Sequence, residues 1–312
     1  MDTRILPTSN VPKILWNNEV LHCPPVLSER YVASLTREGL LEQARHGTTA
    51  DDIHGGQSSE ETRRHFTHRF GVSVGRVQFV TIDPRDLFRS VSNALLSSFA
   101  EGPVALLDLP CGSGAATCSL ISCLVELRKS AVLPQLPLSI VATGADYSAE
   151  AVRIAGDLVN SLTGIAAQHA ITVQWNSQVW DATRTDQTAR LVDNWFGRSP
   201  AGAEHFVLIS NFSGALSTEQ IFGPVMHSLE HIVSRLHDRK STVVWVEPAS
   251  LTAQRRVLPR ILEYFRRWIP WVSPETSPGS PIPTAEYQVC HPVTQLIHSS
   301  SVAVQQFHRT GQ

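Results

Sequence analysis

The sequence predicts an α/β protein built on a doubly wound, mainly parallel sheet. Five short apolar runs alternate with helix-like patterns through the middle of the chain, as in strands joined by helical crossovers. Charged residues make up only 17% of the 312 residues, which fits strands that helices cover on both faces. Two strand-like runs near the C-terminus predict an antiparallel hairpin that closes one edge of the sheet.

The central elements can be assigned in chain order. The five predicted parallel strands are Val104–Leu109, Leu138–Ala145, Ile171–Val179, His205–Ser210 and Ser241–Val246. Helices over Ala115–Lys129 and Ala149–Ser161 connect the first three strands, and Ser148 is a suitable N-cap for the second helix. Ser217 and Gln220 form a capping box for a later helix, which Pro224 is expected to kink or restart.

The two ends of the chain have different patterns. Residues 1–100 are mixed and partly helical, and we expect a mostly helical N-terminal lid that precedes a ligand-binding domain over residues 101–312. In the tail, residues 254–268 are expected to be helical with a break at Pro259. The five prolines of residues 270–283 predict a loop, and residues 285–290 and 301–308 alternate as the two strands of the hairpin.

Composition excludes several classes of protein. The net charge of −2 disfavours a broad nucleic-acid-binding surface. Five cysteines without a C-x-x-C pair disfavour a disulfide framework or a zinc ribbon and fit a reducing compartment. Neither a signal peptide nor an uninterrupted apolar stretch long enough to span a membrane is found, so we expect a cytoplasmic protein with no membrane partner.

Acids and glycines follow the predicted strands where each strand ends. Asp108 and the turn over residues 110–114 follow the first strand, Asp146 and Tyr147 the second, and Asp181 the third. Ligands of open parallel sheets bind at the carboxyl ends of the strands, so these residues form the predicted ligand site.

Each group suits one part of a ligand. Glycines at 112 and 114 let the backbone approach closely, and the helix N-terminus behind them offers N–H groups to a carboxylate. Asp108 offers a carboxylate to an ammonium group, and Asp146 can accept hydrogen bonds from ribose hydroxyls. Asp181 or its backbone neighbours can contact an adenine. An amino acid, a ribose and an adenine together make S-adenosylmethionine.

At these residues the sequence resembles the class I S-adenosylmethionine-dependent methyltransferases over about residues 103–250. The matching blocks are LLDLPCGSG (106–114), GADYSAEAVRIA (144–155), VWDAT (179–183), FVLISNFSGALS (206–217) and VVWVEPAS (243–250). The resemblance implies a Rossmann-like fold of seven strands, methyltransferase activity and S-adenosylmethionine as the cofactor. The cofactor-binding residues that it implies are Asp108, Pro110, Cys111, Gly112, Gly114, Asp146, Tyr147, Asp181 and Asn211.

The sequence departs from the family's pattern at two points, and other ligands and other roles for the acids remain as alternatives. Pro110 replaces the first of the family's usual three glycines, and Asp146 comes 38 positions after Asp108, a longer gap than is usual in the family. A glycine-rich turn also serves dinucleotides and phosphates, but neither the G-x-G-x-x-G spacing nor a Gly-Lys-Ser/Thr follows here. Asp146 as a helix-capping acid and Asp181 as a solvated loop acid stay open as structural readings.

The acceptor side carries fewer signals. Methyl transfer from a sulfonium needs positioning and exclusion of water, and a base only where the acceptor must lose a proton. Asn211, after the fourth strand, and Glu247, at the end of the fifth, are the candidate catalytic residues. The family's branch that methylates adenine and glutamine amino groups has two prolines after its Asn or Asp, and Asn211 lacks them. A structural salt bridge is the alternative role for Glu247.

The segment Glu61–Phe70 is basic and aromatic. In this family such segments often fold over the cofactor, which makes His65 and Arg69 candidate substrate contacts. The alternative is a solvated helix face with Phe66 and Phe70 in the core. Cysteine and histidine residues in the tail are too few and too widely spaced for a metal site, and none is expected.

We therefore expect methyl transfer to an O or N atom of a small-molecule acceptor. The acidic balance, the missing prolines after Asn211 and two segments able to enclose a pocket favour this class. An RNA methyltransferase is the alternative if seven arginines gather into one basic rim, and a non-catalytic binding protein with this fold is another. Those arginines are Arg63, Arg64, Arg69, Arg76, Arg255, Arg256 and Arg260.

Overall fold

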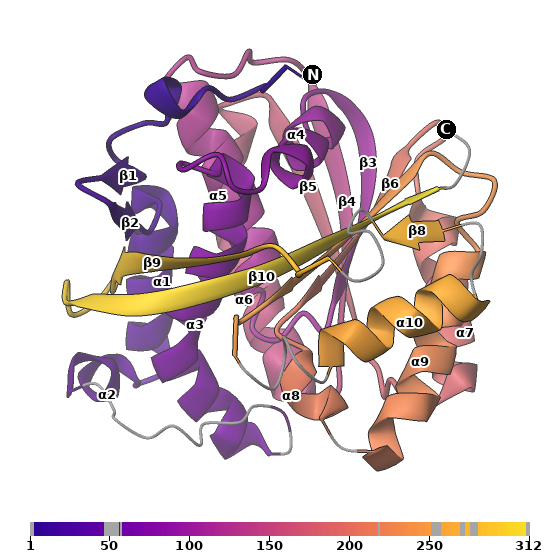
Figure 1. Cartoon of the computed structure of the whole chain (residues 1–312). Helices are drawn as coiled ribbons and strands as arrows, with labels where there is room; N and C mark the ends of the chain where they lie inside the picture. The colour runs from indigo at the N-terminus through magenta and orange to yellow at the C-terminus, as the bar shows by residue number, and fades with distance from the viewer. Residues whose placement is uncertain are drawn as a thin grey trace.

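The computed structural model describes residues 3–46, 56, 58–217, 219–250, 257–268, 272–274 and 280–309. Within these residues ten strands form one mixed sheet in the order β1-β2-β9-β10-β7-β6-β3-β4-β5, with β8 paired to β10 (Figure 1). The strands are β1 (Trp16–Asn17), β2 (Val20–His22), β3 (Gly102–Leu109), β4 (Leu138–Asp146), β5 (Ile171–Val179), β6 (Glu204–Ser210), β7 (Ser241–Glu247), β8 (Val272–Pro274), β9 (Thr284–Cys290) and β10 (Ile297–Arg309).

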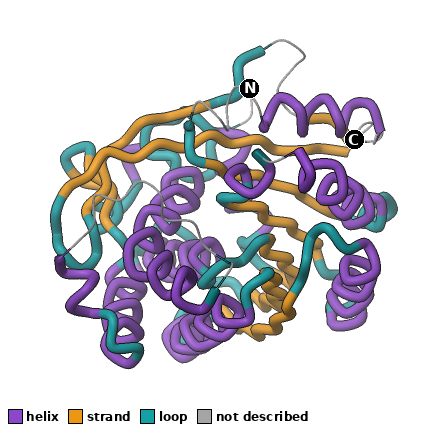
Figure 2. The backbone as a smooth tube through the Cα atoms, turned by 90° about the horizontal axis from the view of Figure 1, so that it is seen from below, coloured by secondary structure: helices purple, strands orange, loops and turns teal. Residues whose placement is uncertain are grey.

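The predicted doubly wound sheet is confirmed. The five strands β3 to β7 are parallel, and β10 runs antiparallel to both β7 and β9. The α-helices are α1 (Pro25–Arg37), α2 (Leu41–His46), α3 (Ser59–Ile82), α4 (Arg89–Ser98), α5 (Ala115–Lys129), α6 (Ala149–Ala167), α7 (Thr185–Arg198), α8 (Ser213–Leu216), α9 (Glu219–Ser234) and α10 (Leu258–Trp268). Seen from the carboxyl ends of the strands, helices lie on both sides of the sheet (Figure 2).

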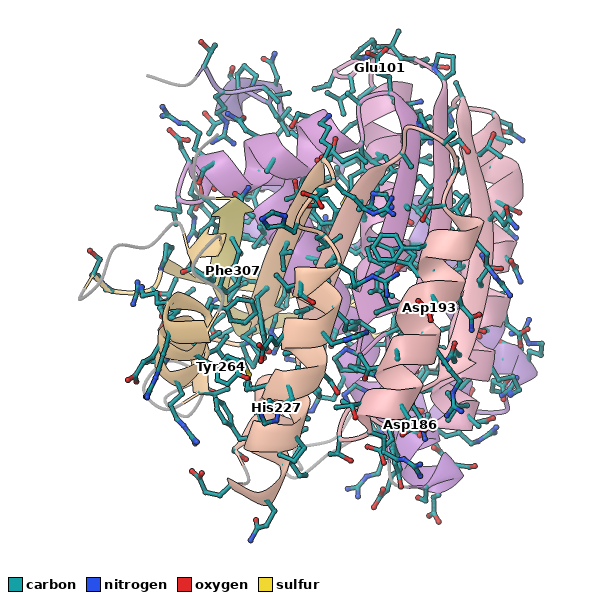
Figure 3. All side chains as sticks on the ribbon, turned by 90° about the vertical axis from the view of Figure 1, so that its right-hand side faces the viewer. Glu101, Asp186, Asp193, His227, Tyr264 and Phe307 are labelled. Carbon is teal, nitrogen blue, oxygen red and sulfur yellow. The ribbon has the colours of Figure 1, made fainter. Side chains whose placement is uncertain are left out.

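Two apolar cores, one on each face, follow from the alternation of side chains along the strands. Along β3, Val104 and Leu106 point into the core beneath α1, α3, α4, α5 and α6, whereas Leu107 and Leu109 point into the core beneath α7, α9 and α10. Figure 3 shows the second face, with Asp186 and Asp193 on α7. A sheet buried on both faces needs few charged residues, which accounts for the low charge content.

The N-terminal region joins the same sheet and core. Helices α1 to α4 form as expected, and α3 packs against α5 and β10. The strands β1 and β2 were not predicted; β2 pairs in parallel with β9 and extends the sheet beyond the hairpin. Strands of two and three residues are too short to show an alternating pattern, so tertiary pairing alone defines them.

Two details of the tail differ from the prediction. Pro259 does not break a helix, because it is the second residue of α10, and a proline is tolerated in the first turn. The segment predicted to be a loop contains β8, which pairs with the end of β10. The start of the predicted helix, at 254–256, and residue 218 of the predicted capping box lie outside the described residues. Pro224 lies inside the helix α9. None of the described helices is both long and apolar enough to cross a membrane.

Candidate functional site

The strand order creates a crevice at the carboxyl ends of β3 and β6. The chain passes from β3 to β4 and β5 on one side and then crosses to β6 and β7 on the other, and ligands of open α/β sheets bind at such a switch point. A cavity of about 140 Å³ lies there. Its lining residues are Gly56, Thr62, His65, Phe70, Ser73, Pro110, Cys111, Gly112, Ser113, Ala115, Asp146, Ala151, Ser210 and Asn211.

The turn after β3 depends on two glycines with positive φ. Gly112 has a φ of +51°, and nothing lies within 4 Å of where its Cβ would be, so this part of the turn is open to a ligand. Gly114 has a φ of +82° and begins α5 without a side-chain cap. A Cβ on Gly114 would lie 3.2 Å from the Cα of Ala155. The first glycine therefore leaves space for a ligand, and the second lets α5 and α6 approach closely.

Asp108, in the last part of β3, is fully buried and is not among the residues that line the cavity. Its Oδ2 accepts hydrogen bonds from the hydroxyl of Thr117 at 2.7 Å and from the backbone N–H of Thr117 at 3.3 Å. Its Oδ1 has no hydrogen-bond partner among the described residues. Burial raises the pKa of Asp108 to about 7, against the opposing effect of the two hydrogen bonds. A carboxylate held this way would be stabilised by a positively charged group from a ligand.

Asp146 ends β4 and lines the cavity. Its Oδ2 accepts a hydrogen bond from the N–H of Gly112 at 2.9 Å, and its Oδ1 accepts one from the N–H of Ser148 at 2.9 Å. Burial raises its pKa, and these backbone hydrogen bonds oppose the shift. Each carboxylate oxygen has a second lone pair, so Asp146 can hold the turn after β3 and still accept hydrogen bonds from ligand hydroxyls.

Helix α3 covers the cavity. It contributes Thr62, His65, Phe70 and Ser73 to the lining. The buried hydroxyl of Thr62 lies 2.8 Å from the hydroxyl of Ser148, which also caps α6. Near the same end, Glu38, Glu150 and Asp157 form ion pairs with Arg63 and Arg153. The N-terminal turns of α3 are thus attached to the loop that carries Asp146.

Asn211 follows β6, and charged side chains from other elements hold it and the two residues after it. It has a φ of +55°, which asparagine tolerates better than most residues. Its Oδ1 accepts a hydrogen bond of 2.6 Å from Nη1 of Arg76 on α3. Glu247 is fully buried, and its Oε1 accepts hydrogen bonds from the N–H groups of Phe212 and Ser213 and from the indole of Trp245. Glu247 does not line the cavity, and its contacts shape the turn after β6.

Comparisons with known proteins give only distant matches. No family model matches this chain, and no curated protein does. A solved structure from work on the conversion of a disulfide bond into a thioacetal group during echinomycin biosynthesis is 13% identical, with a TM-score of 0.38, covering 69% of this chain and 79% of that one. Two structures of the rRNA methyltransferase aviRa from Streptomyces viridochromogenes are 12% and 14% identical, both with a TM-score of 0.34; they cover 74% and 82% of this chain and 84% and 88% of their own.

Matches this distant carry no argument about substrate, so the assignment of the fold depends on the sheet itself. Five parallel strands are wound in both directions from β3, an antiparallel hairpin follows, and the glycine turn and the acid after β4 meet at the switch point. The chain has a doubly wound, Rossmann-like α/β fold. In this fold the turn after β3 and Asp146 lie next to each other at the carboxyl ends of β3 and β4.

Of the remaining predicted residues, some line the cavity and others do not. His65 lines it, whereas Arg69 does not. Tyr147 lies outside the lining with 61% of its surface exposed, at the carboxyl end of β4. Asp181 accepts hydrogen bonds from the N–H and hydroxyl of Thr183 at 2.9 and 2.6 Å and shapes the turn after β5. Burial raises the pKa of the Cys111 thiol well above its usual value, so this residue is a neutral part of the lining.

Several lining residues were missed by sequence reasoning. Thr62 and Ser73 lie on α3, more than 25 residues before β3, and only the packing of that helix brings them to the cavity. Arg76 was named only as part of a possible basic rim. Thr117 had a signal that could have been used, because a threonine in the first turn of the helix after a glycine turn can reach back to the preceding acid.

The arginines of the suggested RNA rim are largely occupied in other contacts. Arg63 pairs with Glu38, and Arg76 binds Asn211 and the carbonyl of Ser301. Arg260 pairs with Glu219 and lies over the ring of Phe222. Residues 255 and 256 lie outside the described residues.

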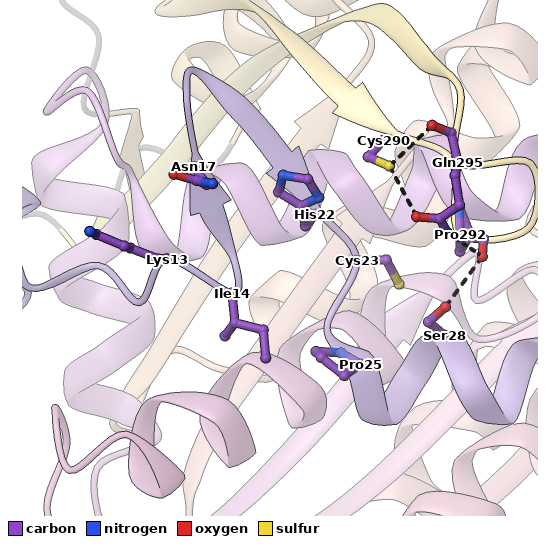
Figure 4. A pocket seen from close by; sticks show the side chains of 10 residues that line it. All are labelled: Lys13, Ile14, Asn17, His22, Cys23, Pro25, Ser28, Cys290, Pro292 and Gln295. Atoms are coloured by element: carbon purple, nitrogen blue, oxygen red, sulfur yellow. Dashed lines mark hydrogen bonds between the residues drawn. The ribbon is translucent and has the colours of Figure 1, made fainter.

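A second cavity, of about 350 Å³, lies at the edge of the sheet that β1 and β2 form (Figure 4). It is lined by the β1–β2 hairpin, the start of α1 and the turn between β9 and β10, and includes Cys23 and Cys290. Burial raises the pKa of Cys23 to about 12, so its thiol is neutral and weakly reactive. This cavity contains none of the predicted site residues.

Proposed function

We propose that this protein is an S-adenosylmethionine-dependent methyltransferase that acts on an O or N atom of a small molecule. The observation that carries the proposal is the buried Oδ1 of Asp108, which has no partner among the described residues and belongs to the strand that leads into an open glycine turn. An amino-acid ammonium group near this oxygen would supply the missing interaction. The cofactor would supply a methyl group already activated by its sulfonium.

The remaining residues suit the other parts of such a cofactor. Gly112 leaves room for close approach of the methionine part, and Asp146 offers carboxylate oxygens to the ribose hydroxyls. Tyr147 and Asp181 follow neighbouring strands, where the adenine would lie. In this proposal α3 acts as the lid, because its first turns close the cavity. A cavity of about 140 Å³ is below the ~300–1,000 Å³ of typical ligand pockets, so binding requires the first turns of α3 to move, while the middle of the helix, which carries Arg76, stays in place.

A small-molecule acceptor is favoured over RNA. The cavity lies between α3 and the sheet, and three of the described rim arginines have partners within the protein. RNA binding would need free cations along an open groove. Glu247 is better placed to hold the turn after β6 than to act as a base, because its Oε1 already accepts three hydrogen bonds.

The test is incubation of the protein with cell extract and cofactor that carries a deuterated methyl group, followed by mass spectrometry of all fractions. We expect the label in one or a few small molecules. A label found only in nucleic acid would replace the small-molecule proposal with RNA methylation. Binding of S-adenosylhomocysteine without labelled product in any fraction would instead support the non-catalytic alternative.

A further inference from the structure

We propose that the acceptor atom is an anionic oxygen, a carboxylate or phenolate, and that the amide of Asn211 donates a hydrogen bond to the acceptor from Nδ2. This inference rests on the proposed methyltransferase function and narrows its acceptor class. Its starting point is the contact between Arg76 and Asn211, in which Nη1 lies 2.6 Å from Oδ1.

The chemistry of arginine determines the orientation of this amide. A guanidinium group has only donors, so only the oxygen of the Asn211 side chain can face it. Arg76 is itself held, because its Nε donates to the carbonyl of Ser301 on β10 at 3.2 Å. If the amide were flipped, the N–H groups of Nδ2 would face the N–H groups of Arg76, and no hydrogen bond could form. The hydrogen-bonding atom that Asn211 has left for the cavity is therefore Nδ2, a donor, and no described residue accepts a hydrogen bond from it.

The backbone at Asn211 is equally constrained. Its N–H donates to the carbonyl of Val246 at 3.0 Å, and Glu247 holds the two following N–H groups at 2.8 and 3.0 Å. Because these contacts come from β7, α3 and β10, the side chain is positioned before any acceptor binds. A positioned donor of this kind binds and orients an anionic oxygen.

This arrangement distinguishes oxygen from nitrogen acceptors. An amine keeps N–H groups that need a hydrogen-bond acceptor, whereas the atom of the Asn211 side chain without a partner among the described residues is the donor Nδ2. A carboxylate or phenolate oxygen instead needs donors, and Nδ2 is one. The acceptor oxygen uses a lone pair to form the new O–CH3 bond while the S–CH3 bond breaks and its electron pair remains on sulfur. The negative and positive charges are both lost, and no proton has to move.

The test combines product identity with an isosteric variant. Wild-type protein is incubated with extract and deuterated-methyl cofactor, and the labelled product is analysed by mass spectrometry and NMR for O–CD3 or N–CD3. Asn211→Asp keeps an oxygen for Arg76 but removes the donor. We expect an O–CD3 product and a kcat/KM at least ~10-fold lower in Asn211→Asp, since the variant loses a hydrogen bond to a charged acceptor, worth ~1.5–3 kcal/mol of binding and orientation, and places a second negative charge beside it.

Two controls make the outcome specific. Affinity for S-adenosylhomocysteine and thermal unfolding are measured for each variant, and we expect the rate to change far more than the affinity. Arg85→Gln, on an exposed arginine that pairs with Glu19, is expected to act as wild type, whereas Arg76→Gln should lower the rate.

An N–CD3 product, or an unchanged rate in a folded Asn211→Asp protein, would overturn the inference and leave methyltransferase function intact. Product identity decides even if the variant does not fold. A wild-type protein that forms no labelled product would refute the proposed function and this inference together.

Discussion

Three buried acids determine much of the chemistry at the scale of single residues. Burial raises the pKa values of Asp108, Asp146 and Glu247, and each is held by hydrogen bonds from the protein. Asp146 orients the turns after β3 and β4, and Glu247 orients the turn after β6. Oδ1 of Asp108 and Oε2 of Glu247 have no partner among the described residues, and of these two acids Asp108 belongs to the strand that leads into the open glycine turn. A buried acid of this kind lowers the stability of the fold when it ionises. Asp108 is therefore explained better by ligand binding than by stability.

Replacement of Asp108 by Asn should stabilise the protein at alkaline pH. The pKa of Asp108 is about 7 in the fold, against 3.8 for the ordinary value. Its contribution to stability is fully present below the unfolded pKa and is lost as pH rises through about 7. The neutral amide of Asn does not ionise, so the variant keeps its stability as the pH rises. Urea unfolding at about pH 8 should give a free energy of unfolding ~1–3 kcal/mol higher for Asp108→Asn than for the wild type. A gain of the same size at about pH 5 would contradict the assignment of the effect to ionisation.

Binding of S-adenosylhomocysteine should depend on the same ionisation. Below about pH 7 Asp108 becomes protonated and loses its attraction for the ammonium group of the ligand. We expect affinity to fall as pH decreases below 7, by up to about tenfold per pH unit. Calorimetric titrations across this range would show it, and Asp108→Asn should bind weakly at every pH. A wild-type affinity that does not change across pH 7 would place the ammonium group elsewhere.

At the scale of elements, α3 connects the N-terminal region to the part of the sheet where we propose that the cofactor binds. Its first turns line the cavity, its middle places Arg76 beside Asn211, and its length packs on α5 and β10. The buried contact between the hydroxyls of Thr62 and Ser148 joins it to the end of β4. The position of this helix therefore affects both the cofactor site and the acceptor side.

Thr62→Val tests the attachment of α3. The variant removes one hydroxyl of a buried pair without changing the size of the side chain, so we expect a loss of ~1–2 kcal/mol in the free energy of unfolding. We also expect weaker binding of S-adenosylhomocysteine, because the lid is less well positioned. The matched control is Thr36→Val, where an exposed hydroxyl donates to the carbonyl of Val32 within its own helix. Equal losses in the two variants would show that the contact with Ser148 has no special role.

At the scale of the whole molecule, the pattern of apolar residues predicted the parallel strands of the sheet, but not the short strands β1 and β2 or the start of α10. Strands such as β4 and β7 are apolar runs with clear ends, so their existence and parallel arrangement followed from pattern alone. The strands β1 and β2 are two and three residues long and exist only by pairing with each other and with β9. Pro259 shows a related limit, since its effect depends on where the helix begins, and a sequence pattern locates helix ends poorly.

The candidate site was partly predictable for the same reason. The turn at 110–114 and Asp146 each follow a parallel strand. Ligands of such sheets bind at the carboxyl ends of the strands, so the sequence predicted that these residues lie close together. Thr62 and Arg76 lie far away in sequence, and only packing of α3 brings them to the site. The role of Glu247 depends on three hydrogen bonds that no spacing reveals. Sequence patterns thus indicated which cofactor to consider, whereas the orientation of Asn211 required coordinates.

Titration calorimetry with S-adenosylhomocysteine tests the central claim most directly. We predict that wild-type protein binds, that Asp146→Ala loses ~1–3 kcal/mol of binding free energy with its hydrogen bonds to the ligand, and that Gly112→Val binds much more weakly because a side chain enters the open turn. Asp193→Ala, on exposed α7, should bind as wild type does. No binding by wild-type protein, or equal affinity in all four proteins, would contradict the placement of the cofactor at the carboxyl ends of β3 and β4.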